Sequence, residues 1–280
     1  MKWTDEAEKA IGKVPFFARR KARAYIEEEA GRGGACQVTL EHVTVCGKRF
    51  LSGKEMDKQV KGFQVEACFG PGGCKNRVVE SVSLTDELER TLLSRDLPGF
   101  MRQRVGGPLK FHHEFRISVS ECPNACSRPQ IVDIGIIGAR FPRISNHPCT
   151  HCGSCVEACR EQAIRLMEGE TTGPCMDTDL CVGCGKCPRA CPSGAVQDGR
   201  CGWRILIGGK LGRHPQLGRE LAGIYSARET LIIVEQCLDI YLEHNLSGER
   251  FGAVLNRIGY DMPGSGLRPP VVLSAPGGMR

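Results

Sequence analysis

The sequence has few aromatic side chains, no long apolar segment and no strong excess of charge of either sign. No uninterrupted apolar run approaches the roughly 18 residues that a membrane-spanning helix requires, so we expect no membrane span. The opening residues MKWTDEAEKA are charged and contain no apolar signal core. Basic and acidic residues are mixed, and the net charge of +6 comes without a polybasic tail, so the composition gives poor support for nucleic acid binding.

Cysteine, in contrast, is abundant, with 17 in a chain of 280 residues. In a small secreted protein this number would predict disulfides, but this chain is large, its cysteine count is odd and it shows no signal peptide. Clustered thiols in such a chain favour metal-bound thiolates, and we therefore expect a reducing cytoplasm. The aromatic content of 6% fits this interpretation, because inorganic clusters occupy volume that rings would otherwise fill.

Residues 1–50 predict a small helical domain. Thr4 can cap a first short helix and Thr39 a third. Between them a helix is predicted that stops at Gly31. One face of this helix carries Phe17, Ala18, Ala22, Tyr25 and Ile26. Residues 52–62 are expected to form a polar linker.

Strand-like and helical segments alternate after the linker. Strands are predicted for FQVEACFG, for the half-buried alternating segment HEFRISVS, for IVDIGIIG and for WRILIGG. Helices are predicted for SLTDELERTLLSRDLP, which stops before Pro98, and for ETLIIVEQCLDIYLEHN and ERFGAVLNRIGY. This pattern predicts one α+β domain over residues 60–145 and 198–265, followed by an extended tail. The Cys- and Gly-rich block 146–197 would be inserted into a loop between two strands, where insertion costs least.

The inserted block contains one pattern twice. C-x2-C-x2-C-x3-C occurs in CTHCGSCVEAC and again in CVGCGKCPRACP. In bacterial two-cluster ferredoxins the first three cysteines of such a run hold one cubane and the fourth ligates the other. We therefore assign one 4Fe–4S cluster to Cys149, Cys152, Cys155 and Cys191. The second is assigned to Cys181, Cys184, Cys187 and Cys159.

The block therefore predicts a bacterial-type two-cluster ferredoxin domain and electron transfer. A zinc ribbon is the alternative, but zinc needs only four ligands per ion and does not explain a doubled four-cysteine run. One departure from the ferredoxin pattern is Arg160, which stands where a proline usually follows the last cysteine.

Four of the remaining cysteines form a weaker pattern, C-x5-C in CFGPGGC followed by C-x3-C in CPNAC. Glycines let the first loop bend closely, and Pro123 and Asn124 suit a tight turn. Four thiolates from two loops at strand ends could hold one more cubane, and a set of unrelated structural thiols is the alternative. The remaining thiols match no ligand pattern, and we expect buried bystanders at Cys36, Cys46, Cys175, Cys201 and Cys237.

These loops and their flanks resemble the siroheme-binding half of sulfite and nitrite reductases. The resemblance is to the gamma-subunit type of anaerobic sulfite reductase, which carries a ferredoxin insert. It covers roughly residues 60–262 and includes the FRI strand, DIGIIG, RILIGGKLGRHP and GERFGAVLNRIG. The resemblance implies that a third 4Fe–4S cluster is held by Cys68, Cys74, Cys122 and Cys126. It further implies that Cys126 bridges this cluster to the siroheme iron.

A siroheme reductase of this family would bind a carboxylate-rich ring and an anionic substrate, so its pocket should be basic. Candidates that bind the cofactor are Lys75, Arg77, Arg128, Lys210 and Arg213. Candidates that act on the substrate, beside Cys126, are Arg116 and Lys110. The expected reaction is six-electron reduction of sulfite or nitrite, with electrons delivered through the ferredoxin-type clusters.

This chain contains one reductase half where well-known sulfite reductases use two, so the pocket could be completed by a homodimer or by a partner subunit. A redox donor protein is also implied. Two alternatives stay open: a non-catalytic electron-transfer or tetrapyrrole-binding subunit, and a zinc protein that binds nucleic acid. The N-terminal residues WTDEAEKAIGKVPFFARRKARAYIEEEA resemble the helical C-terminal domain of the light-independent protochlorophyllide reductase B subunit, which also acts on a tetrapyrrole.

Overall fold

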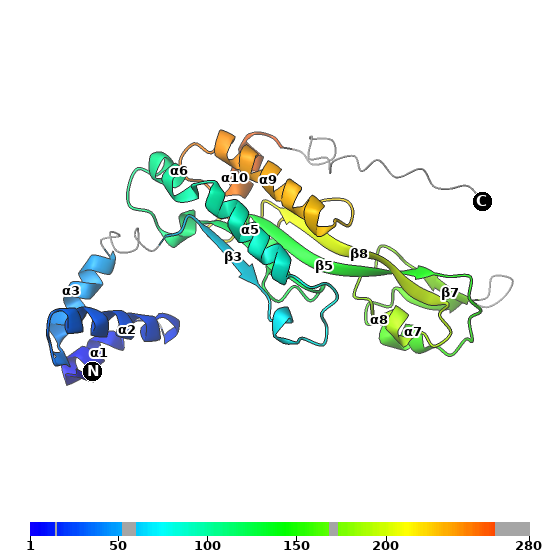
Figure 1. Ribbon diagram of the computed structural model, residues 1–280, viewed down its shortest axis with the longest axis horizontal. Coiled ribbons are helices and arrows are strands. Elements are labelled where there is room, and N and C mark those ends of the chain that lie inside the picture. The colour runs from blue at the N-terminus through cyan, green and yellow to red at the C-terminus, as the bar shows by residue number, and fades with distance from the viewer. Residues whose placement is uncertain (15, 52–59, 168–172, 261–280) are drawn as a thin grey trace. The chain divides into compact units, whose positions relative to one another are not determined.

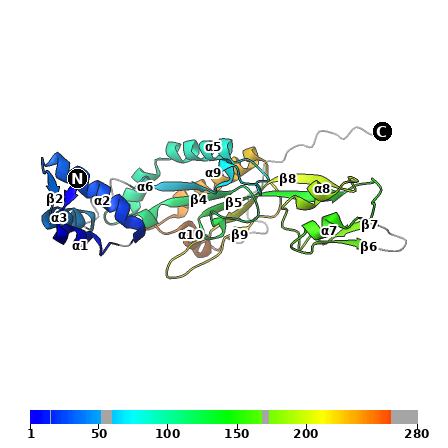
Figure 2. The same ribbon diagram turned by 90° about the horizontal axis from the view of Figure 1, so that it is seen from below.

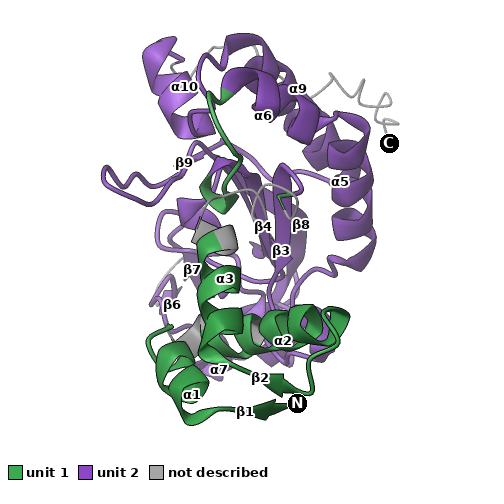
Figure 3. Cartoon of the chain, turned by 90° about the vertical axis from the view of Figure 1, so that its left-hand side faces the viewer, with its two compact units in different colours: residues 1–60, 105–112 green, residues 61–104, 113–280 purple. Residues whose placement is uncertain are grey.

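The computed structural model describes residues 1–14, 16–51, 60–167 and 173–260. It divides into two compact units, residues 1–60 with 105–112, and residues 61–104 with 113–280 (Figure 3). We describe each unit by itself. No helix among the described residues is long and apolar enough to cross a membrane.

Within its described residues, the first unit contains three α-helices and a parallel pair of two-residue strands. Their bounds are β1 Lys2–Trp3, α1 Asp5–Ile11, α2 Phe16–Arg32, β2 Gln37–Val38 and α3 Leu40–Leu51. The buried core consists of Ala7, Ile11, Ile26, Ala30, Val38 and Cys46. Ala22 and Tyr25 pack against this core as predicted, whereas the side chains of Phe17 and Ala18 lie outside the described part of the structure.

Both predicted caps lie at helix starts in this unit. The Thr4 hydroxyl accepts a hydrogen bond from the Ala7 N–H at 3.3 Å, and α3 begins directly after Thr39. The prediction that the second helix stops at Gly31 is wrong, because α2 continues to Arg32 and the left-handed glycine that follows is Gly34 (φ 74°).

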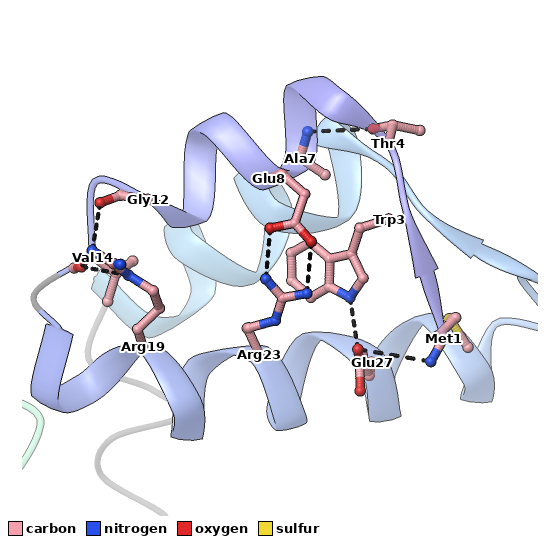
Figure 4. Close-up of polar contacts among 10 residues, drawn as sticks. All are labelled: Met1, Trp3, Thr4, Ala7, Glu8, Gly12, Val14, Arg19, Arg23 and Glu27. Carbon is pink, nitrogen blue, oxygen red and sulfur yellow. Dashed lines mark hydrogen bonds and ion pairs between the residues drawn. The ribbon is translucent and has the colours of Figure 1, made fainter.

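A stacked ion pair joins α1 to α2 (Figure 4). The Arg23 guanidinium donates to both Glu8 carboxylate oxygens at 2.6 and 2.7 Å and lies 4.3 Å from the centre of the Trp3 ring. The Trp3 indole N–H donates to Glu27 at 2.6 Å. The hydrogen bond from Arg23 lowers the pKa of Glu8, although both groups are largely open to water and the pair adds little stability.

The second unit is built on a mixed five-stranded sheet of order β3-β4-β5-β8-β9 (Figure 1). The strands are β3 Phe63–Ala67, β4 Phe115–Ser120, β5 Ile134–Ile144, β8 Val196–Ile207 and β9 Arg219–Glu220. β3, β4 and β5 run parallel, and β5–β8 and β8–β9 pair antiparallel. The chain is therefore mixed α+β, as predicted.

Helices cover this sheet. Their bounds are α5 Val82–Ser94, α6 Leu97–Arg104, α9 Ala227–His244 and α10 Phe251–Arg257. α5 and α9 lie side by side, α5 against β3 and α9 against β8 (Figure 1). Aromatic rings of Phe115, Tyr241 and Phe251 meet in the core, with the Phe115 and Tyr241 ring centres 4.9 Å apart. Short 3-10 turns lie at Gly70–Gly72, Phe111–His113 and Pro129–Ile131.

Two sequence predictions need correction here. β4 is not half-buried, because five of its six residues are buried between its neighbours β3 and β5 in the sheet. The helix predicted to stop before Pro98 does end, at Ser94, but a further helix then begins at Leu97 with Pro98 in its first turn, where a missing N–H costs nothing. The predicted tail and most of the linker at 52–62 lie outside the described residues.

The segment between β5 and β8 carries its own small elements. They are α7 Ser154–Ala158, β6 Ile164–Met167, β7 Gly173–Met176 and α8 Lys186–Ala190, with β6 and β7 paired antiparallel. Figure 2 shows these elements together beyond the ends of β5 and β8.

Candidate cysteine-rich redox site

Two of the site cysteines leave the sheet at the same edge. Cys68 follows β3 and Cys122 lies just past β4, and these adjacent strands are parallel with Ala67 opposite Val119. The Cys68 N–H continues the ladder by donating to the Val119 carbonyl at 2.9 Å. Because carboxyl ends of parallel strands meet at one edge, residues 54 positions apart in sequence are brought together there.

The loop that leads from Cys68 to Cys74 bends around the Glu121 side chain. A Cβ added to Gly70 would lie 1.9 Å from the Glu121 Oε2 atom, so only glycine fits against this carboxylate. Gly73 takes the left-handed conformation at φ 96°. The N–H groups of Gly70 and Glu121 both donate to the Cys68 sulfur at 3.3 Å, which fixes the position of this sulfur in the loop.

The loop that carries Cys126 is strained and tied to the strand before it. Ala125 (φ 52°) and Arg128 (φ 59°) both adopt the left-handed region, which is costly for residues other than glycine. Ser127 holds the loop through its carbonyl, which accepts from the Ser118 hydroxyl at 2.7 Å, and through its hydroxyl, which lies 2.7 Å from that of Ser120. The buried serines of β4 therefore fix a conformation that the loop would not adopt alone.

The four thiols of these two loops are neighbours. Burial raises the pKa of the Cys122 thiol, and the negative charges of Cys126, Cys68 and Cys74 raise it further. Cys122 is buried, Cys68 and Cys74 are half-buried, and Cys126 is exposed. Among the described residues no three His, Cys, Asp or Glu side chains converge closely enough to hold a single metal ion.

The two ferredoxin-like runs fold as twins. Each passes through a left-handed glycine, Gly153 (φ 75°) or Gly185 (φ 64°), into a five-residue helix, α7 or α8. Each helix ends directly before the fourth cysteine of its run, Cys159 or Cys191. The repeated sequence pattern therefore produces a repeated local structure.

The fourth cysteine of each run lies near the thiols of the other run. Burial raises the pKa of Cys155, and charges of Cys191 and Cys149 add to the shift. Burial also raises the pKa of Cys187 to about 12, with further contributions from Cys181, Cys184 and Cys159. A small cavity of about 20 Å³ is lined by this second group, Cys159, Cys181, Cys184 and Cys187, together with Pro142 and Ile164.

Comparison with known protein families identifies which family this architecture belongs to. A family model described as the nitrite and sulphite reductase 4Fe-4S domain matches residues 62–262. The chain belongs to this family. A second model, the proto-chlorophyllide reductase 57 kD subunit, matches residues 3–45, as the N-terminal resemblance predicts.

Relatives of the reductase domain are named sulfite reductases. The chain is 34% identical over 196 residues to a coenzyme F420-dependent sulfite reductase of Methanocaldococcus jannaschii, which is 69% of this chain and 29% of that protein. It is 27% identical over 105 residues to one subunit of the anaerobic sulfite reductase of Salmonella typhimurium, which is 38% of this chain and 26% of that protein. The chain thus spans under a third of the length of either relative.

The likeness to solved structures is weaker. The crystal structure of dissimilatory sulfite reductase I aligns with a TM-score of 0.46 and 18% identity, covering 77% of this chain and 58% of that one.

The basic residues expected to bind the cofactor lie in three different segments of the second unit. Lys75 and Arg77 are exposed beside the Cys74 loop, and Arg128 is exposed two residues after Cys126. The glycine loop that holds Lys210 and Arg213 meets the same region, because the Gly218 N–H donates to the Gln130 carbonyl at 2.7 Å. These side chains remain candidates for binding the cofactor.

Arg116, one of the two basic residues predicted to act on the substrate, is not brought to the cysteines in this way. Arg116 lies near the start of β4, at the opposite end of the strand from Cys122, and its N–H donates to Asp133. Lys110 belongs to the segment 105–112 that groups with the first unit. Proximity in sequence to the motif loops does not encode the direction in which a strand runs, and the roles given to both residues stay predictions.

The prediction of buried bystanders holds for some of the remaining cysteines. Cys46 and Cys237 are buried, and burial raises the pKa of Cys237 to about 12. Cys36 and Cys201 are exposed and Cys175 is half-buried, so the prediction is wrong for these three.

Sequence reasoning also missed two supporting groups, Glu121 and the serine network of β4. Glu121 is 1% exposed, and its Oε1 accepts from the N–H and the hydroxyl of Ser81, both at 2.8 Å. Polar residues within the otherwise apolar strand FRISVSE are the signal that could have identified them.

Proposed function

We propose that the chain is a siroheme and iron–sulfur reductase of sulfite or nitrite. When bound, siroheme and the iron–sulfur clusters would relay to the anion the six electrons that its reduction requires, and an external redox donor protein would supply them. The observation that carries this proposal is that Cys68 and Cys122 leave adjacent parallel strands at one edge of the sheet, with Cys74 and Cys126 in the loops that follow, within the matched family domain. A reducing cytoplasm is the proposed setting, because cluster ligands must stay reduced.

These four cysteines would hold the cluster that is coupled to siroheme. Backbone N–H groups directed at the Cys68 sulfur suit a thiolate ligand, since hydrogen bonds to sulfur also tune a cluster's potential. Cys126 is proposed as the residue that would link this cluster to siroheme, because it is the exposed residue of the four. The Asn124 side-chain N–H donates to the Cys126 sulfur at 3.0 Å and would orient it.

Two further 4Fe–4S clusters are proposed for the segment between β5 and β8. Cys149, Cys152, Cys155 and Cys191 would hold one, and Cys159, Cys181, Cys184 and Cys187 the other. The cavity among the second group and the position of each fourth cysteine beside the other run support this crossed assignment. The proposed total is three clusters and one siroheme.

The anion would meet the exposed basic residues around the two loops. Lys75, Arg77 and Arg128 flank the thiols and would neutralise carboxylates of the ring or the charge of the substrate. The family domain matches the chain once, over residues 62–262, so a partner subunit or a second copy of this chain is proposed to complete the pocket.

Replacing the proposed bridge tests the function. In Cys126→Ser we expect siroheme to be lost while the two ferredoxin-type clusters remain, because those clusters use other ligands. Anaerobic visible spectra should show isobacteriochlorin bands in the wild-type protein and only iron–sulfur absorption in the variant. Iron should fall from about thirteen per chain, four for each cubane plus the siroheme iron, to about eight or twelve depending on whether the coupled cluster survives. Unchanged siroheme absorbance would refute the assignment.

A second candidate is a non-catalytic electron-transfer or tetrapyrrole-binding subunit. It is favoured by the single reductase half and by the small share of each named relative that the chain spans. Steady-state reduction of sulfite and nitrite with a reduced viologen separates the two functions. Turnover by the chain with full cofactor content supports the reductase, and full cofactor content without turnover supports the non-catalytic role.

A further inference from the structure

The twin cysteine runs differ in what surrounds their glycines. Gly183 and Gly185 of the second run are buried, and an added Cβ would lie 2.9 Å from the Phe141 ring or from Arg140 Cδ. At the matching positions of the first run stand His151, which is exposed, and Gly153, which has no atom within 4 Å of an added Cβ. All four residues have positive φ, so backbone conformation alone does not explain the difference. The second run is packed against β5, where Phe141 and Arg140 lie.

Arg140 makes the contacts that join this run to the reductase loops. Its N–H donates to the Gly183 carbonyl at 2.7 Å, and it forms a parallel bridge with Cys184. Its guanidinium donates to the Val78 carbonyl at 3.1 Å and to Asp198 at 2.7 Å. One residue of β5 therefore contacts both the second run and the segment that follows Cys74.

A continuous set of hydrogen bonds leads from Val78 to the Cys68 sulfur. The Val78 N–H donates to the Glu121 carbonyl at 3.0 Å, and the Glu121 N–H donates to the Cys68 sulfur at 3.3 Å. Arg189, in α8, adds a second link by donating to the Arg77 carbonyl at 3.4 Å. The Arg140 hydrogen bond starts on β5, against which the second run packs, and the Arg189 hydrogen bond starts on α8 within that run. Both are accepted by backbone carbonyls of residues 77–78.

We propose that Arg140 is a positioning residue that holds the second run, Cys181 to Cys187, at a fixed spacing from the Cys68–Cys74 loop. The second run is then the inner one, adjacent to the reductase cysteines, and the first run is the outer one, available to an external electron donor. This inference rests on the proposed function for its redox meaning. Its structural part depends only on contacts within the chain.

Matched glycine variants test the packing. Gly185→Ala and Gly153→Ala change the same position of the two runs and impose similar strain at positive φ, but only the former pushes against Arg140. We expect hydrogen exchange of the Val78 and Val79 amides in the cofactor-loaded protein to rise about tenfold in Gly185→Ala and to stay within about twofold in Gly153→Ala. Equal rates in the two variants would overturn the proposal.

Substitution of Arg140 tests the charge as well as the contact. Arg140→Met should accelerate the same amides and lower the midpoint potential of one ferredoxin-type centre, because the residue whose backbone bridges to Cys184 loses its positive charge. Arg140→Lys should keep the potential. Arg143→Met is the control, since Arg143 lies on the same strand but binds Gln197 and the Asp198 carbonyl instead. An equal potential shift in Arg143→Met would contradict the assigned role.

These measurements separate this inference from the proposed function. A wild-type protein without siroheme bands would remove the reductase proposal, and the exchange difference between the two glycine variants would still decide the packing. A protein with full siroheme but equal exchange in both variants would keep the reductase and remove the positioning role of Arg140.

Discussion

At the scale of single residues, the buried carboxylate of Asp133 connects β4 to the start of α10. It is 1% exposed, and its carboxylate accepts from the Arg250 guanidinium at 2.7 and 3.0 Å. It also accepts from the N–H groups of Arg116 at 2.9 Å and Phe251 at 3.1 Å. Four donors compensate this buried charge, and removing one partner of such a pair is strongly destabilising.

Asp133→Asn should therefore destabilise the protein strongly. It leaves the Arg250 charge without its counter-ion, and the expected loss is about 3–5 kcal/mol in the free energy of unfolding, measured by chemical denaturation. Asp239→Asn is the control, because the Arg95–Asp239 pair has the same 2.7 Å separation but is exposed. Its expected loss is about 0–1 kcal/mol. Similar losses in the two variants would contradict the role given to burial.

At the scale of elements, α9 is the best-capped helix of the reductase unit. The Ser226 hydroxyl accepts from the Glu229 N–H at 3.2 Å, and Glu229 accepts from the Ser226 N–H at 2.8 Å. Apolar residues of the helix, among them Ile233, Val234 and Leu238, are buried against the sheet. The cap and the apolar face act together to place α9 beside α5.

Ser226→Ala should cost about 1 kcal/mol in unfolding free energy, with Ser247→Ala, an exposed turn serine, as the near-neutral control. Hydrogen bonds from Ser226 lower the pKa of Glu229 in the folded protein. The stabilisation from its carboxylate is therefore complete above its ordinary pKa of 4.5 and is lost as pH falls through the lower folded value. Glu229→Gln should remove this acid-side change from the pH profile of stability, and an unaltered profile would exclude the contribution.

At the scale of the whole molecule, the two compact units have separate cores. The first unit buries Ala7, Ile11, Ile26, Ala30, Val38 and Cys46, whereas the cysteine loops and the sheet belong to the second. A core of this size is small, so the first unit should have the lower stability of the two.

Ile11→Ala tests whether the two units unfold independently of each other. Ile11 is 1% exposed, and its truncation should destabilise the first unit by about 2–5 kcal/mol. Hydrogen exchange should rise in peptides of α1, α2 and α3, while iron content and the visible spectrum stay unchanged. A parallel rise in peptides of β4 and β5 would show that the units unfold as one.

Much of the fold could be predicted from local patterns. The strands around Ile117, Ile136 and Ile205 and the helix that begins at Ala227 follow from apolar periodicity and turn residues. The helix at Leu97 was missed because Pro98 can equally end one helix or stand in the first turn of the next. The burial of β4 was underestimated because its central place in the sheet depends on strands that are distant in sequence.

Local sequence is enough to define which residues can serve as thiolate ligands and how each run folds, because cysteine spacing and left-handed glycines act over a few residues. Which thiols meet is a property of the tertiary structure. The parallel register of β3 and β4 brings Cys68 and Cys122 to the same edge of the sheet. The second run, rather than the first, packs against Arg140. Such contacts depend on strand order and direction, which no local spacing encodes.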